Sequence, residues 1–196
     1  MHLPVPFPAL APLCPDRVRH RASMSLCLLL SACEPIGGKD DTGGMIGPGG
    51  VQDLTAPDQT RGSIASGAAI DLAWAADSSV ACWPTTEDLN FDGHHVFYRL
   101  RQPEQSLLSV TLQPDDGVDL SLYLLQFGVG AEQLPPNVSQ AVSCEAGYDQ
   151  TRDRNPGAAE DARLTATTNA YDVLIGVAGA NGATTGGFEL TVALEQ

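Results

Sequence analysis

The chain has 196 residues, of which 24 are acidic and 10 are basic, for a formal net charge of −14. This length accommodates one domain, with or without tails. Because Lys39 is the only lysine and no basic stripe occurs, the composition argues against binding to nucleic-acid phosphates or to anionic lipid headgroups. The acidic balance is typical of a solvated surface and leaves divalent cations as candidate ligands.

The first 32 residues have the order of a secretory signal. Basic residues cluster at positions 17–21, an apolar run follows from Met24 to Leu30, and small residues then lead to Cys33. The apolar run is too short to span a bilayer, which takes about 20 apolar residues. We therefore expect residues 1–32 to be a signal peptide. Residues 1–23 are either an unusually long positive region or the result of a misassigned start, with Met24 or another upstream codon as the alternative start.

The end of this leader resembles the lipobox of bacterial lipoproteins, with the sequence Leu30-Ser31-Ala32-Cys33. The resemblance implies cleavage before Cys33, a thioether-linked lipid on its sulfur, and a cell-envelope protein held to the membrane by that anchor. In the better-known sorting rule, an aspartate directly after the lipidated cysteine is the retention signal. This chain has Glu34 there instead, which favours the outer membrane, on its periplasmic face or at the cell surface. The alternative is an ordinary leader in which Cys33 is a free or buried cysteine.

Five cysteines are present, and the predicted removal of the leader determines which of them remain in the mature chain. Processing would remove Cys14 and Cys27 and would lipidate Cys33, which leaves Cys82 and Cys144. In an oxidising compartment an even pair predicts one disulfide. It would close a loop of about 60 residues and stabilise the fold by about 3–4 kcal/mol. No CxxC pair or His/Cys cluster occurs, which disfavours a structural zinc site.

Residues 33–67 are rich in glycine, proline and aspartate and contain few apolar side chains. Such a segment cannot bury enough surface to offset its chain entropy, so we expect the lipidated cysteine to be followed by a disordered tether. A coil of about 35 residues has a reach of about 30–35 Å, which would hold a domain away from a membrane.

From Ile70 onward, apolar and polar residues alternate, which predicts β-strands. The alternating runs, separated by turn residues, lie at 70–74, 96–101, 108–112, 118–124, 171–177 and 188–195. Six or more short strands without a helical period predict an all-β fold, an antiparallel β-sandwich or barrel over residues 68–196. The segment 132–161 has little strand signal and is expected to form long loops.

Four segments resemble, in order, strands of the pre-peptidase C-terminal (PPC) domain: Val96–Leu100, Val118–Leu124, Ala170–Val177 and Gly186–Val192. The resemblance covers residues 68–196 and implies a jelly-roll-like sandwich. Domains of this family are usually non-catalytic accessory modules of secreted peptidases, and they often bind calcium or an insoluble polymer. The chain departs from the family at Asp172, where the pattern has an aromatic or hydrophobic residue.

No catalytic constellation is recognisable in the predicted domain. His94 and His95 are its only histidines, and adjacent residues on a strand point to opposite faces, so we expect two surface side chains rather than two ligands of one ion. The chain has no Gly-x-Ser-x-Gly elbow, no phosphate loop and no dinucleotide motif. We therefore expect a protein that is not an enzyme.

Calcium is the one cofactor that the residues favour, because Ca²⁺ takes oxygen ligands from loops. The candidate ligands are the aspartates of two predicted loops, Asp115, Asp116 and Asp119 in one and Asp149 and Asp153 in the other. Neither loop has the spacing of an EF-hand, and the alternative is that both are ordinary acidic turns.

These features together predict a non-catalytic, lipid-anchored module of the cell envelope that binds or supports a polysaccharide or a protein partner. The alternative is an accessory domain that works with a separately encoded secreted peptidase or hydrolase. A calcium-responsive sensor is a third reading.

Overall fold

The computed structural model describes residues 50–77, 80–148 and 156–196, which fall in a compact unit over Asp41–Gln196. The predicted signal peptide and Cys33 lie outside the described residues, as do Asp149 and Asp153.

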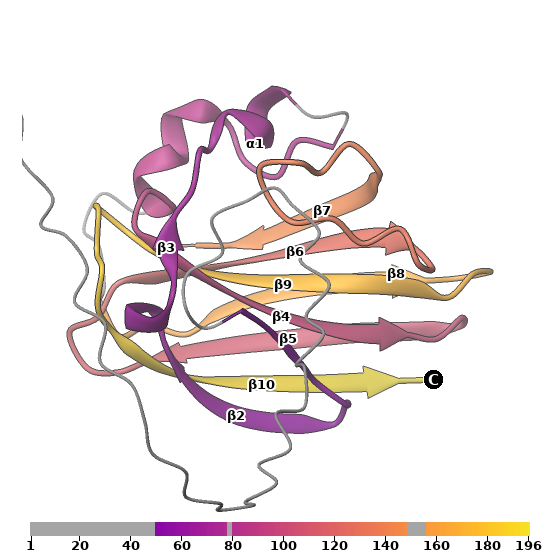
Figure 1. The fold of residues 1–196 in the computed structure, drawn as a ribbon. Helices are drawn as coiled ribbons and strands as arrows, with labels where there is room; N and C mark the ends of the chain where they lie inside the picture. The colour runs from indigo at the N-terminus through magenta and orange to yellow at the C-terminus, as the bar shows by residue number, and fades with distance from the viewer. Residues whose placement is uncertain (1–49, 78–79, 149–155) are drawn as a thin grey trace, which may run out of the picture. The chain divides into compact units, whose positions relative to one another are not determined.

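Two β-sheets pack face to face (Figure 1). The larger sheet has the order β1 (Val51–Asp53), β4 (His94–Gln102), β9 (Tyr171–Gly179), β6 (Leu120–Gly128) and β7 (Ala141–Gly147), and the short β3 (Ala68–Ala69) also pairs with β4. The smaller sheet has the order β2 (Asp58–Ser63), β10 (Gly187–Glu195), β5 (Ser106–Pro114) and β8 (Glu160–Ala166). All pairings are antiparallel except that of β1 with β4. The predicted all-β sandwich is confirmed.

The space between the sheets holds the main hydrophobic core. Alternate residues of the long strands point into it, as the period-two pattern requires. On β4, for example, Val96, Tyr98 and Leu100 are buried there, opposite Leu190 and Val192 of β10 in the other sheet.

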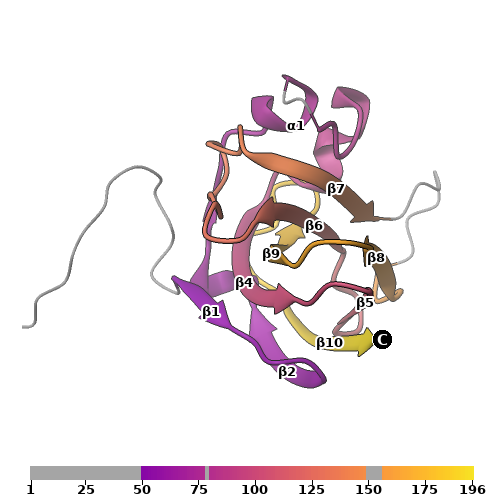
Figure 2. The same ribbon diagram turned by 90° about the vertical axis from the view of Figure 1, so that its right-hand side faces the viewer.

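A second core lies on the outer face of the larger sheet. Phe97, Tyr123 and Leu174 point to that face and are covered by residues 70–77 and 80–91 and by the loop that leads into β7. The covering segment, here called the cover, contains α1 (Ala73–Asp77) and the 3₁₀ helix η2 (Thr85–Asn90). Figure 2 shows α1 on the side of the larger sheet that faces away from β10 and β5. Burial on both faces explains why β6 is buried along almost its whole length.

The folded part begins before the predicted boundary at residue 68, because β1, β2 and the 3₁₀ turn η1 (Ile64–Ser66) belong to the sandwich. The sequence of β2 contains no large apolar residue and therefore gives no strand signal. Its inward-facing Gly62 leaves room for two aromatic rings, since a Cβ there would lie 2.3 Å from the Tyr98 hydroxyl and 2.5 Å from Phe188 Cζ. The tether predicted for residues 33–67 was too long.

Two further predictions were wrong. Residues 70–74 were expected to form a strand, but α1 begins at Ala73, where Asp71 accepts a hydrogen bond from the Ala73 amide (2.9 Å), and Trp74 packs in the outer core. The segment 132–161 was expected to form long loops, but it contains β7 and the start of β8. Both strands turn small residues inward, so hydrophobic alternation does not mark them.

Candidate functional site

The two histidines differ from the expectation of surface side chains. His95 is 2% exposed and lies in the outer core. Its Nε2 donates to the Phe91 carbonyl (2.6 Å), so its Nδ1 accepts from the Tyr123 hydroxyl (2.9 Å). Burial lowers the pKa of His95 from 6.5 to about 4, with a smaller opposing effect of the hydrogen bond to Phe91. The imidazole is therefore neutral near pH 7 with both nitrogens occupied, while His94 is only partly buried.

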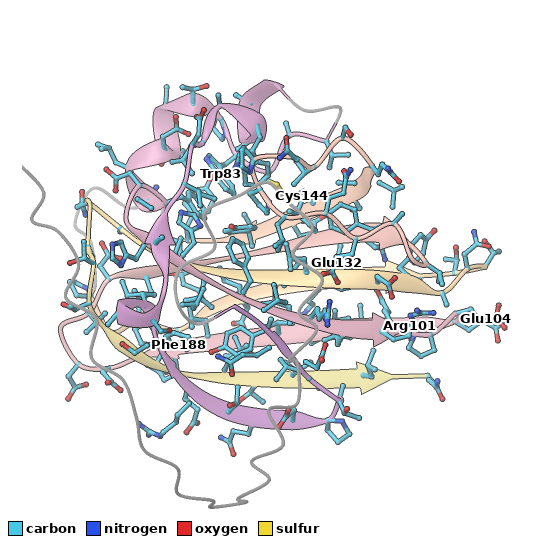
Figure 3. The ribbon with its side chains drawn as sticks, in the orientation of Figure 1. Trp83, Arg101, Glu104, Glu132, Cys144 and Phe188 are labelled. Atoms are coloured by element: carbon cyan, nitrogen blue, oxygen red, sulfur yellow. A yellow bond between two sulfur atoms is a disulfide. The ribbon has the colours of Figure 1, made fainter. Side chains whose placement is uncertain are left out.

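The predicted pairing of Cys82 with Cys144 is present as a disulfide, with 5.1 Å between the Cα atoms. It joins the cover to β7, and both cysteines pack against the outer core. Next to Cys82, the ring of Trp83 stacks on Phe91 with 3.7 Å between ring centroids. Figure 3 shows Trp83 and Cys144 on the same side of the sheet. The disulfide thus holds an aromatic layer against the sheet.

The predicted calcium ligands are only partly described. Asp115 and Asp116 lie in the turn between β5 and β6, where Asp115 forms an exposed ion pair with Arg61 (3.8 Å). Asp119 lies just before β6, and its carbonyl accepts a hydrogen bond from the Ala180 amide. Within residues 50–77, 80–148 and 156–196, no three His, Cys, Asp or Glu side chains are grouped so that they could hold a metal ion. Calcium binding involving the second loop stays a prediction.

The structure instead brings charged residues of four separate segments together on the outer face of the larger sheet, beyond the cover. They surround an open depression of about 460 Å³, with an adjoining one of about 190 Å³. We call this site the charged cleft; it is lined by Asp53, Leu54, Arg99, Leu100, Arg101, Gly130, Glu132 and Asp172. Figure 3 shows Arg101 near the end of β4 and Glu132 beside β9, nearer the middle of the sheet.

Strand register places the ion pairs of the charged cleft. Asp53 of β1 is the direct partner of Arg99 on β4, and their side chains are hydrogen-bonded through Arg99 Nε. Asp172 of β9 is the direct partner of Arg101, whose Nε donates to Asp172 Oδ1 (2.6 Å). The second oxygen of Asp172 accepts the Gly130 amide (2.6 Å), which fixes the loop that follows β6.

Glu132 is the carboxylate of the cleft whose charge is least compensated. Its side chain is 18% exposed, and its nearest cation is Arg99, with 3.7 Å between Arg99 Nη1 and Glu132 Oε1. Burial raises the pKa of Glu132 above its ordinary value, the charges of Asp172 and Asp53 raise it further, and Arg99 opposes them. The hydrogen bond and charge of Arg99, in contrast, lower the pKa of Asp53. Three carboxylates share two guanidinium groups.

Comparison with known protein families gives no match, and no curated protein sequence matches the chain. Solved structures with a similar course of the chain include the pre-peptidase C-terminal domain of a collagenase from Bacillus anthracis (12% identity, 74% of this chain and 96% of that chain, TM-score 0.40). Others are PliG of Aeromonas hydrophila, a periplasmic inhibitor of g-type lysozyme (12%, 74% and 96%, 0.38), and CorA of Methylomicrobium album BG8, a surface-associated copper-binding protein (10%, 74% and 98%, 0.45).

At these identities and TM-scores, the similarities concern the course of the chain through a β-sandwich and say nothing about ligands or partners. Among the described residues, no helix is both long enough and apolar enough to cross a membrane.

Proposed function

We propose that the protein is an exported, lipid-anchored module of the cell envelope that binds a polymer or partner and does not catalyse a reaction. The disulfide between Cys82 and Cys144 carries the first half of this proposal. Disulfides form and persist outside the reducing cytoplasm, so a chain whose outer core is held by one is suited to an exported protein. The sequence Leu30–Cys33, at the end of a basic and apolar leader, supplies both the export signal and the anchor.

The folded part begins close in sequence to the predicted anchor. With β1 beginning at Val51, 17 residues (34–50) separate it from Cys33.

A binding role is supported by the hydrogen bonds of the polar side chains among the described residues. His95, the one buried histidine among the described residues, is neutral and has both ring nitrogens occupied, so it is not a free base. In the charged cleft, Arg99 and Arg101 are each hydrogen-bonded to a carboxylate, and none of its lining residues carries a hydroxyl or thiol nucleophile. The cleft presents fixed hydrogen-bonding groups to solvent, which is the property of a recognition site.

The anchor is tested by membrane fractionation and intact mass after expression in a proteobacterial host. The wild-type chain is expected in the membrane fraction as a species that begins at Cys33 and carries added diacylglycerol mass. Cys33→Ala removes the thioether sulfur and should move the protein to the soluble fraction. Cys27→Ala changes another leader cysteine and should leave lipidation unchanged. Membrane association of Cys33→Ala equal to that of the wild type would refute the anchor.

The accessory role beside a separately encoded peptidase stays the alternative. Co-purification of a peptidase with the membrane-bound chain would favour it.

A further inference from the structure

The charged cleft holds hydrogen-bonding groups that the fold does not use. Nε of Arg101 is bonded to Asp172, but both terminal nitrogens of this half-exposed side chain lack a partner among the described residues. The same holds for Nη2 of Arg99 and, on the acceptor side, for Oδ2 of Asp53 and Oε2 of Glu132. Free donors and free acceptors therefore lie side by side around one depression.

The combination of free donors and free acceptors limits which class of ligand the charged cleft can bind. An anion would meet three carboxylates, and an organic cation would meet two guanidinium groups, so each would face like charges. A metal ion is not favoured, because the described carboxylates of the cleft do not form a group that could hold one. A hydroxyl group donates and accepts at once, so neighbouring hydroxyls can pair with guanidinium and carboxylate together.

The size and position of the cleft fit a small saccharide. Its larger depression has a volume of about 460 Å³, within the usual range of small-molecule sites, about 300–1,000 Å³. Arg101 lines the adjoining depression of about 190 Å³, which shares Asp53, Arg99, Glu132 and Asp172 with the larger one. Asp172 is 16% exposed at its side chain, accepts from both Arg101 and Gly130, and so holds the guanidinium in place before a ligand arrives.

We propose that the charged cleft binds a neutral, hydroxyl-rich saccharide. The inference rests on the proposed binding role and gives it a ligand class. Arg101 donates to sugar oxygens through its terminal nitrogens, Glu132 and Asp53 accept from sugar hydroxyls, and Asp172 acts as a positioning residue for Arg101.

The test is an amide NMR titration of the full chain carrying Cys33→Ala, which keeps the protein free of lipid. The neutral probes are maltotriose, cellotriose and triacetylchitotriose, and the charged probes are trigalacturonate and trilysine. At least one neutral trisaccharide should shift the amides of Gly130 and Arg101 in a saturable way, with a dissociation constant below about 10 mM. The charged probes should not saturate these signals.

Variants tie the binding to the cleft. Arg101→Gln keeps a polar side chain without the guanidinium, and Glu132→Gln keeps the length of the side chain without its charge. Each should weaken the binding by about tenfold or more. The control is Arg61→Gln, which removes an exposed arginine that also forms two ion pairs but lies outside the cleft, and it should bind as tightly as its parent. Amide spectra that are otherwise unchanged will show that each variant is folded.

Three outcomes overturn the proposal: no saturable shift with any neutral probe, saturation by a charged probe alone, or unchanged affinity in Arg101→Gln. None of these outcomes bears on the anchor, because the titration contains no membrane. Loss of the anchor in the fractionation experiment would likewise leave the binding result standing.

Discussion

The buried His95 predicts how the stability of the protein depends on pH. In the folded state its pKa is about 4 because of burial, and in the unfolded chain it returns to 6.5. Between these two values the unfolded state binds one proton more than the folded state, so the free energy of unfolding falls as the pH falls. The contribution is fully present above about pH 7 and is lost progressively toward pH 4.

The magnitude follows from the two pKa values. At about 1.4 kcal/mol per pH unit, the difference between 6.5 and about 4 corresponds to about 3 kcal/mol in total, and about 2 kcal/mol of it is lost by pH 5. The proton would have to enter a site where the Phe91 carbonyl and the Tyr123 hydroxyl are the hydrogen-bonding partners of the ring, and the charge interaction with His94 lowers the pKa of His95 further. Neither hydrogen-bond partner of the ring is a carboxylate that could stabilise the protonated imidazole.

The assay is urea unfolding from pH 7.5 to 4.5, followed by tryptophan fluorescence under non-oxidising, non-reducing conditions that keep the disulfide intact. Trp83 is a suitable reporter because it stacks on Phe91, whose carbonyl accepts from His95. The quantity to follow is the stability difference between the wild type and His95→Gln, because other titrating groups, such as Glu132 with its raised pKa, contribute equally to both. The difference should shift in favour of His95→Gln by about 2 kcal/mol between pH 7 and pH 5. A difference that stays constant over this range would refute the assignment of a neutral, buried imidazole.

Two further predictions concern the outer core. Gly176→Ala should destabilise the fold by about 1–3 kcal/mol in urea unfolding, because its Cβ would lie 2.1 Å from Cζ of the buried Tyr123 ring; Gly128→Ala, whose Cβ meets nothing closer than 4.0 Å, is the matched control and should cost less than about 0.5 kcal/mol. Equal effects of the two substitutions would contradict the packing argument. Loss of the disulfide, which spans 62 residues, should cost about 4 kcal/mol. Cys82→Ser, Cys144→Ser and the double variant should be equally destabilised, and additive losses would show that the two cysteines act separately.

Hydrophobic alternation predicted the strands that carry large inward-facing residues and missed those that carry small ones. On β8 two of the three inward residues are Ala162 and Ala166, and on β2 the inward position opposite Phe188 is Gly62. In each case large side chains of a neighbouring strand, far away in the sequence, fill the space beside the small residues. Hydrophobic alternation therefore marks the strand with the large side chains and does not mark the strand with the small ones.

The sequence did not predict the outer core, because the apolar residues at 70–74 alternate as they would in a strand. Ile70, Leu72 and Trp74 alternate with polar or small residues, but Trp74 belongs to the short helix α1 and all three pack in the outer core. Burial of His95 depends on Tyr123, which is 28 residues away, and on the cover above it. Only the tertiary arrangement turns a strand-edge histidine into a core residue.

The sequence contains a signal for the charged cleft, but the residues that carry it lie in separate segments. The described residues hold four arginines, and two of them, Arg99 and Arg101, point to the same face of one internal strand. Asp172, which departs from the pattern of the PPC strands, is the direct register partner of Arg101. A one-residue slip of β4 would turn both arginines into the main core, so the pairs with Asp53 and Asp172 favour the observed register.

Exposed ion pairs of this kind contribute little to stability, about 0–1 kcal/mol each. Their effect is to fix the direction of the two guanidinium groups through Nε, while both terminal nitrogens of Arg101 and Nη2 of Arg99 remain free. A substitution such as Arg101→Gln should therefore change binding far more than folding. That separation is what distinguishes a recognition site from a set of ion pairs that only holds strands together.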